Sequence, residues 1–198
     1  MNKNLSSAQE IIKKISTLLA DKIEQDNIKG ACDRIPFILK YYLRRYHHLD
    51  IDIHFGLIEH NSQYARHNWN SYKGQKIDVT IHNQLINEIN SDCVILDEIY
   101  IAKGDNVIYH DCNHLPTDYL DKIEQARYHE YHLKNIPNRT EEEEYALQGW
   151  LEILEVNSSL LRVEKQKMTE IESVQTYIND HLEDEWNDVL QYLKCKNL

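Results

Sequence analysis

The sequence predicts an α+β protein in which helices come first, a mostly antiparallel sheet follows and further helices come last. Residues 6–46 carry apolar side chains at helical spacing, residues 51–110 contain short runs of alternating apolar residues, and a polar helical pattern returns after Pro116. A chain of 198 residues, 41% hydrophobic and 28% charged, suits one domain with an added subdomain. We therefore expect a core over residues 1–115 and a helical extension over 116–198.

Two helices are expected before the sheet. In residues 6–25 the apolar side chains recur at every third or fourth position. A second apolar stripe starts at Ile35, and Pro36 fits only the first turn of a helix, where its missing N–H costs nothing. This second helix should therefore begin within a residue or two of Cys32 or Asp33.

Five strands are expected in the middle of the chain, from their alternating apolar residues and their content of β-branched and aromatic residues. They cover residues 51–59, 65–71, 75–81, 93–101 and 106–110. The second and third flank Lys73-Gly74, a pair of residues that favours a two-residue hairpin turn. The sheet should therefore contain at least one tight antiparallel hairpin.

The last third of the sequence predicts helices only. Residues 117–134 have a polar helical pattern, which ends before Pro137. Thr140 and Glu143 have the spacing of a capping box and should start a long helix. A last helix is expected over residues 170–194, with its apolar residues on one face.

Composition narrows the classes of function. With 22 Lys and Arg against 33 Asp and Glu, the formal charge of −11 disfavours binding to nucleic acid. No segment has the apolar length of a membrane span, and the N-terminus lacks the apolar core of a signal peptide. The cysteines lack CxxC spacing, which indicates free thiols in a reducing cytoplasm; export without a cleaved signal, as bacterial effectors use, stays open. They are Cys32, Cys93, Cys112 and Cys195.

The position of Cys32 at the expected start of a helix suggests a nucleophile. The partial positive charge of unpaired N–H groups at a helix N-terminus favours a thiolate. The same N–H groups can stabilise an oxyanion on a carbonyl that the sulfur attacks. A nucleophilic cysteine also needs a base, normally histidine, and the histidine needs a residue that orients it.

His67 and Asp78 can supply this base and this orienting residue. A two-residue turn at 73–74 pairs Trp69 with Asp78 and His67 with Thr80 across the hairpin. Because residues on one face of a sheet alternate, His67 and Asp78 then lie on the same face as diagonal neighbours. A single extra residue in either strand would place Asp78 on the opposite face.

This order of residues resembles the transglutaminase-like branch of the papain-like superfamily. The pieces that carry the resemblance are G-A-C at 30–32, H-N-W at 67–69, K-G at 73–74 and I-D-V-T at 77–80. In that group a cysteine begins a helix, a histidine precedes an aromatic residue on a strand, and an aspartate lies on the next strand. The resemblance covers about residues 28–82 and implies a papain-like core.

Residue by residue, the resemblance implies Cys32 as nucleophile, His67 as general base and acid, Asp78 as the orienting residue and Trp69 as a packing or substrate-binding residue. The implied reaction is acyl transfer or hydrolysis on an amide of a protein or peptide, without a cofactor. Peptidase, deamidase and transglutaminase activities share its first half, and the sequence does not separate them. It gives no indication of the oligomeric state.

The sequence departs from the family pattern around the cysteine. Asp33 and Arg34 follow Cys32 directly, and the negative charge of Asp33 would oppose a thiolate. The side chain that donates to the oxyanion is expected from Gln25 or Asn27, the available amides before the cysteine.

Two other classes of function stay open. One is a non-catalytic protein-binding module on the same fold, with the acidic helical extension as its partner surface. The other is a zinc-binding protein that uses Cys112 with His110 and His114, since zinc accepts thiolate and imidazole ligands. His129 and His132 are spaced HExH rather than HExxH, so the zinc-protease motif is not met, and we expect no metal site.

Overall fold

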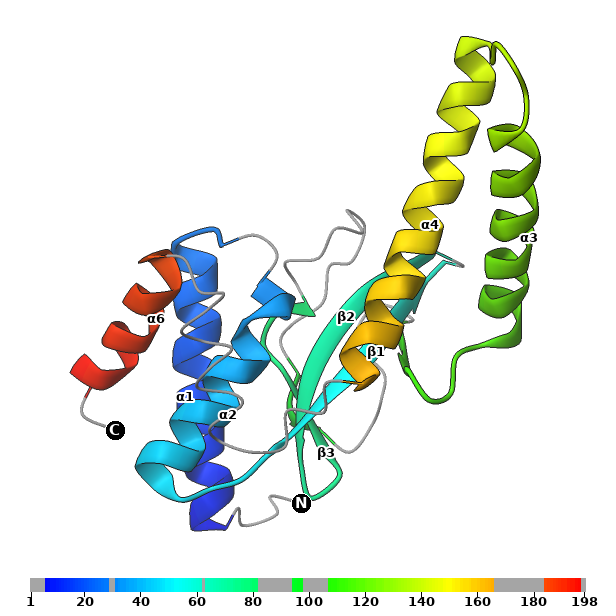
Figure 1. Ribbon diagram of the computed structural model, residues 1–198. Helices are drawn as coiled ribbons and strands as arrows, with labels where there is room; N and C mark the ends of the chain where they lie inside the picture. Colours follow the sequence, from blue (N-terminus) through cyan, green and yellow to red (C-terminus); the bar gives the residue numbers. More distant parts are fainter. Residues whose placement is uncertain are drawn as a thin grey trace.

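The protein is described from a computed structural model, over residues 6–28, 31–61, 63–81, 94–97, 107–165 and 184–196. Its described elements confirm the α+β class, with helices before and after an antiparallel sheet (Figure 1). In chain order they are α1 (Ser7–Gln25), the 3₁₀ turn η1 (Ala31–Asp33), α2 (Ile35–His47), β1 (Asp52–His60), β2 (Gln63–Tyr72), β3 (Gln75–Asp78), β4 (Val94–Asp97), β5 (Ile108–Asp111), α3 (Thr117–Lys134), α4 (Glu141–Lys165) and α6 (Asp184–Cys195).

The five strands form one sheet in the order β4-β3-β2-β1-β5, and each described pair is antiparallel. The hairpin between β2 and β3 turns at Lys73 and Gly74, both of which have positive φ, as a tight hairpin turn requires. β3 ends at Asp78, three residues earlier than the sequence predicts, because the Asp78 carboxylate accepts the N–H and the hydroxyl of Thr80 and turns the backbone.

The helix that follows Cys32 starts at Ile35, with Pro36 in its first turn as expected. Cys32 itself lies before this helix, in the separate turn η1, which Arg34 closes by donating its N–H to the carbonyl of Ala31 at 3.1 Å. Two residues, Asp33 and Arg34, therefore separate Cys32 from the first residue of α2, and the effect of the helix dipole on the sulfur is smaller than the sequence suggested.

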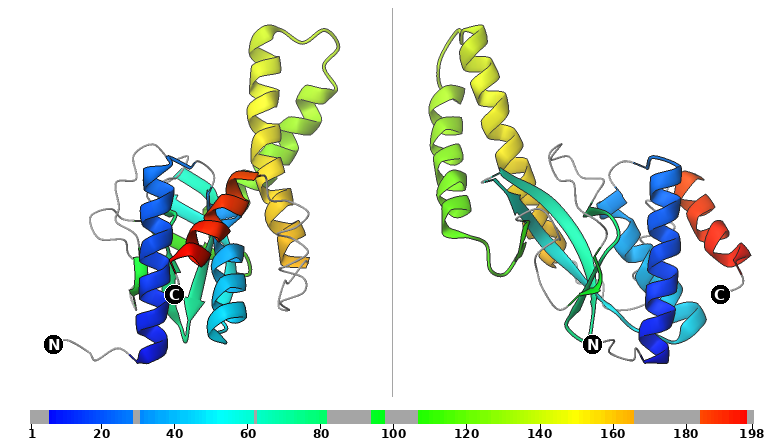
Figure 2. Two further views of the ribbon diagram at one scale, coloured as in Figure 1. Left: turned by 90° about the vertical axis from the view of Figure 1, so that its left-hand side faces the viewer. Right: turned by 180° about the vertical axis from the view of Figure 1, so that it is seen from behind.

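One face of the sheet packs against α1 and α2, and α6 lies on the far side of these two helices from the sheet (Figure 1). Apolar side chains of α1 and α2 share a buried cluster with Ile77 and Val79 of the β3 region and with Val189 and Leu193 of α6. The hydroxyl of Tyr42 donates to the carbonyl of Leu193 at 3.1 Å. Figure 2 shows α6 lying beside the N-terminal helices. The expected last helix is present over Asp184–Cys195, and the rest of its predicted range lies outside the described residues.

Helices α3 and α4 form an antiparallel pair that extends beyond the end of the sheet (Figure 1). At its base, Tyr119 and Ile123 of α3 pack with Leu57 of β1. The capping box predicted for α4 is present, since Glu143 donates its N–H to Thr140 Oγ1 at 3.2 Å and accepts the N–H of Thr140 at 2.8 Å. We call this pair of helices the helical arm.

Within the described part of the chain, no helix combines the length and the apolar character that a membrane crossing requires.

Candidate active site

The structure brings His67 of β2 and Asp78 of β3 together. The register of the hairpin pairs Tyr72 with Gln75 and Asn70 with Ile77, as the two-residue turn requires. Continued along the strands, this register places His67 and Asp78 on one face. His67 Nε2 lies 2.6 Å from Asp78 Oδ2, and the two side chains are 0% and 1% exposed.

Asp78 is the centre of a buried hydrogen-bond network. Its Oδ2 also accepts the hydroxyl of Tyr109 at 2.7 Å, and its Oδ1 accepts the N–H and the hydroxyl of Thr80 at 3.0 and 2.9 Å. Burial alone would raise the pKa of Asp78, but the charge and hydrogen bond of His67, with those of Tyr109 and Thr80, lower it below its ordinary value. The side chain is therefore an ionised carboxylate that holds the imidazole in place.

The imidazole of His67 responds to Asp78 and to Cys32. Burial alone would lower the pKa of His67, but the Asp78 carboxylate outweighs it, and a hydrogen bond and charge from Cys32 act in the same direction. The resulting pKa is raised from 6.5 to about 10. Nε2 is engaged by Asp78, and the buried Nδ1 has no hydrogen-bond partner among the residues that the structure describes, so Nδ1 is the nitrogen left for the thiol.

The negative charge beside Cys32 is paired. Asp33 Oδ1 lies 4.0 Å from the sulfur of Cys32, which is 9% exposed. The other oxygen of Asp33 accepts a hydrogen bond from Arg66, and Asn68 donates to Oδ1 at 3.4 Å. Both partners belong to β2, on either side of His67. Arg66 therefore offsets the charge that would oppose a thiolate, and it ties η1 to the strand that carries His67.

Trp69 and Gly56 shape the sheet next to His67. Trp69 is buried and stacks on His67, with ring centroids 6.3 Å apart and planes at 15°. Gly56 of β1 pairs with His67, and a Cβ atom at this position would lie 1.9 Å from the carbonyl oxygen of His110 and 3.0 Å from the ring of Trp69. Only glycine therefore lets β5 and Trp69 approach β1 this closely.

Gln25 and Asn27 lie at the end of α1 and just after it, and both are exposed. Within the described residues, neither side chain makes a hydrogen bond. Residues 29 and 30, which connect this region to Ala31, lie outside the described part of the chain. The assignment of either amide as an oxyanion donor stays a prediction.

The histidines considered as zinc ligands have other partners. His110 Nε2 lies 2.7 Å from Glu59 Oε2, and His129 stacks on Trp150 with centroids 4.7 Å apart. Over the residues that the structure describes, no three or more His, Cys, Asp and Glu side chains are grouped so that they could hold a metal ion. Cys93 lies outside these residues.

Sequence reasoning missed two residues of this site, Tyr109 and Arg66. Tyr109 lies on the predicted strand 106–110, where its alternation with Ile108 and His110 could have placed it on a sheet face, but not beside Asp78. Arg66 directly precedes His67, and its pairing with Asp33 depends on how η1 meets β2.

Comparison of this chain with protein-family models, with curated proteins and with solved structures finds no match. The class that fold and site define is thus an α+β protein with a buried His–Asp pair beside a cysteine. What this constellation does has to be argued from its own geometry.

Proposed function

We propose that the protein is a cysteine-dependent acyltransferase or hydrolase with a papain-like, transglutaminase-like core, in which Cys32, His67 and Asp78 act on an amide of a protein or peptide. One observation carries the proposal: Asp78 holds Nε2 of His67, while Cys32 acts on the same imidazole ring. This is the order of nucleophile, base and orienting residue that thiol catalysis needs.

The raised pKa of His67 determines where the proton resides before reaction. At neutral pH the imidazole is protonated, so it stabilises a Cys32 thiolate as an ion pair. The sulfur attacks the carbonyl carbon, and the C–N bond breaks as His67 gives its proton to the leaving nitrogen. Water or an amine then attacks the thioester and gives its proton to His67, the C–S bond breaks, and release of the acyl group restores the Cys32 thiolate and the protonated imidazole.

Selective alkylation of Cys32 tests this proposal. Iodoacetamide is applied to the full chain at neutral pH, and the adducts are located by mass spectrometry. We expect Cys32 to react at least about tenfold faster than the exposed Cys195, although it is far more buried, because the ion pair with His67 favours its thiolate. The substitution His67→Asn keeps a donor for Asp78 but accepts no proton, and it should abolish the preference.

The matched control is His129→Asn, which changes an exposed histidine of the helical arm and should leave the labelling unchanged. Circular dichroism establishes that each variant is folded. Labelling of Cys32 no faster than that of Cys195 in the wild-type protein would overturn the proposed catalysis.

The acyl acceptor is identified with peptides that contain either glutamine or Gly-Gly. Ammonia release from glutamine indicates deamidation, incorporation of an added amine indicates transamidation, and cleavage after Gly-Gly indicates peptidase activity. Each product should disappear in Cys32→Ser. Products that persist in this variant would assign the reaction to another residue.

A second candidate function is protein binding through the helical arm. Three of its tyrosines are strongly exposed: Tyr128 at 62%, Tyr131 at 69% and Tyr145 at 84%. Exposed aromatic side chains are common anchors of protein interfaces. Equal reactivity of Cys32 and Cys195 in the alkylation experiment would favour this function over catalysis.

A further inference from the structure

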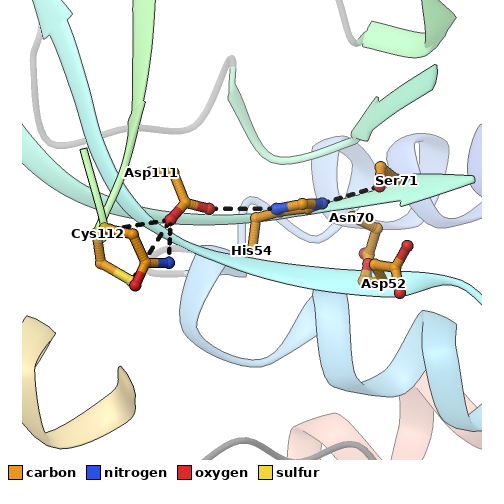
Figure 3. A network of polar contacts seen from close by, with 7 residues as sticks. Asp52, His54, Asn70, Ser71, Asp111 and Cys112 are labelled. Atoms are coloured by element: carbon orange, nitrogen blue, oxygen red, sulfur yellow. Dashed lines mark hydrogen bonds and ion pairs between the residues drawn. The ribbon is translucent and has the colours of Figure 1, made fainter. Parts of the chain in front are cut away.

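A second His–Asp pair joins β1 to the edge strand β5, with a serine of β2 next to it. His54 of β1 lies across from Trp69 of β2, Ser71 follows two residues after Trp69, and Asp111 of β5 lies across from Gly56 of β1. Because side chains of a strand alternate between faces, Ser71, His54 and Asp111 all project from one face. Figure 3 shows the imidazole of His54 between the serine hydroxyl and the aspartate carboxylate.

The hydrogen bonds fix the tautomer of His54. Its Nδ1 lies 3.4 Å from Asp111 Oδ2, and its Nε2 lies 2.8 Å from Ser71 Oγ. A carboxylate only accepts, so Nδ1 carries the proton that is donated to Asp111. In the neutral ring Nε2 is then an acceptor, and Ser71 donates its O–H to it. A histidine base must contact a serine nucleophile in this way.

Asp111 and His54 are each held by further contacts. Asp111 Oδ1 accepts the backbone N–H of Asn113 at 3.0 Å and its side-chain amide at 2.7 Å, which leaves Oδ2 for His54. Burial alone would raise the pKa of Asp111, but the bonds from Asn113 and His54 outweigh it and lower the pKa, which keeps the carboxylate ionised. Trp69 stacks on His54, with centroids 5.5 Å apart and planes at 10°, and so fixes the plane of the imidazole.

Solvent reaches this second histidine. The side chains of His54 and Asp111 are 29% and 33% exposed, so a small molecule can reach the imidazole. Ser71 itself is buried.

We propose that Ser71, His54 and Asp111 form a serine-dependent site that hydrolyses small carboxylic esters. Ser71 Oγ bonds to the acyl carbon while its proton passes to Nε2 of His54. The bond to the alkoxy oxygen then breaks, and the departing alcohol takes this proton. Water loses a proton to His54 and attacks the acyl-serine; the carboxylic acid leaves as the proton returns to Ser71 Oγ. The buried position of Ser71 restricts the site to a narrow acyl group.

The test uses the full chain carrying Cys32→Ser in every sample, so that reaction at this thiol does not contribute. A fluorophosphonate probe should label Ser71, as located by mass spectrometry, and the protein should hydrolyse p-nitrophenyl acetate. We expect Ser71→Ala to abolish the adduct and to lower hydrolysis at least about a hundredfold, because the nucleophile is lost. His54→Gln should lower the rate of labelling at Ser71 and the rate of ester hydrolysis to a similar extent.

Asp111→Asn provides a second variant that keeps the size of the side chain and should lower labelling at least about tenfold, since the tautomer of His54 is no longer fixed. Ser158→Ala, on the exposed surface of α4, is the matched control and should change neither readout. No adduct at Ser71, or the same rate of hydrolysis after Ser71→Ala in a folded protein, would overturn the proposal and leave the three residues as a structural contact between strands.

Discussion

The sheet carries two His–Asp pairs on the same face, and their surroundings differ. His67 and Asp78 are 2.6 Å apart and almost fully buried, whereas His54 and Asp111 are 3.4 Å apart and about one third exposed. Trp69 stacks on both imidazoles. Water screens the second pair and not the first, so the same two residue types should give a strong interaction in one place and a weak one in the other. Burial, more than residue type, sets the strength of each pair.

The largest effect on stability is expected from Asp78→Asn. This change leaves the protonated imidazole of His67 buried without the charge of Asp78, which should lower the free energy of unfolding by about 3–5 kcal/mol. Urea denaturation followed by circular dichroism measures it. A loss below about 1 kcal/mol would mean that the buried pair is no stronger than an exposed one.

The same pair can be weakened by pH, with a smaller effect, because Asp78 keeps its bonds to Tyr109 and Thr80. The pKa of His67 is raised, so its stabilising contribution is complete below 6.5 and is lost as pH rises towards about 10. The pKa of Asp78 is lowered, so its contribution is present above 3.8 and is lost at lower pH.

The difference in unfolding free energy between the wild-type protein and Asp78→Asn should therefore be greatest between pH 3.8 and 6.5 and should shrink at higher pH. Urea titrations at a series of pH values measure this difference. A difference that stays constant up to pH 10 would show that His67 carries no raised pKa.

Gly56→Ala tests the region that joins the two pairs, because Gly56 is in register with His67 on one side and with Asp111 on the other. The added methyl group would collide with the carbonyl of His110. We therefore expect the free energy of unfolding to fall by about 3 kcal/mol, the upper end of the range for overpacked cores. Gly149→Ala, which has open space around it in α4, is the control and should not destabilise. Equal melting temperatures for the two variants would contradict the close approach of β5 to β1.

The smallest effect is expected from Asp111→Asn. The pair with His54 is partly exposed and long, so its removal should cost at most about 1 kcal/mol in urea denaturation. Stability and reactivity are then separated, since the same variant should lose most of its labelling at Ser71. A loss as large as that of Asp78→Asn would remove the distinction between the two pairs.

The sequence predicts the first pair better than the second because their chain separations differ. His67 and Asp78 are joined by one hairpin, and Lys73 and Gly74 set its register through local geometry. His54 and Asp111 are 57 residues apart and meet only because β5 pairs with β1. No local pattern indicates which strand is the neighbour of another, so the sequence did not place Asp111 beside His54, and it left zinc binding by the neighbouring residues only as an open alternative.

The start of α2 shows a different limit. Pro36 places the helix correctly, but Cys32 lies in a separate 3₁₀ turn in which the N–H of Arg34 donates to the carbonyl of Ala31. Such a bond leaves no periodic pattern of side chains. Helix positions were therefore predictable to within a few residues, while the local environment of the sulfur was not.

The packing of α6 against α1 has a consequence for synthesis on the ribosome. Val189 and Leu193 belong to the same apolar cluster as Ile12 and Leu19, so part of the N-terminal helix stays uncovered until residues 184–195 have been translated. Folding of this cluster is therefore completed late, after the sheet has been made. Until then the growing chain exposes apolar surface that chaperones can recognise.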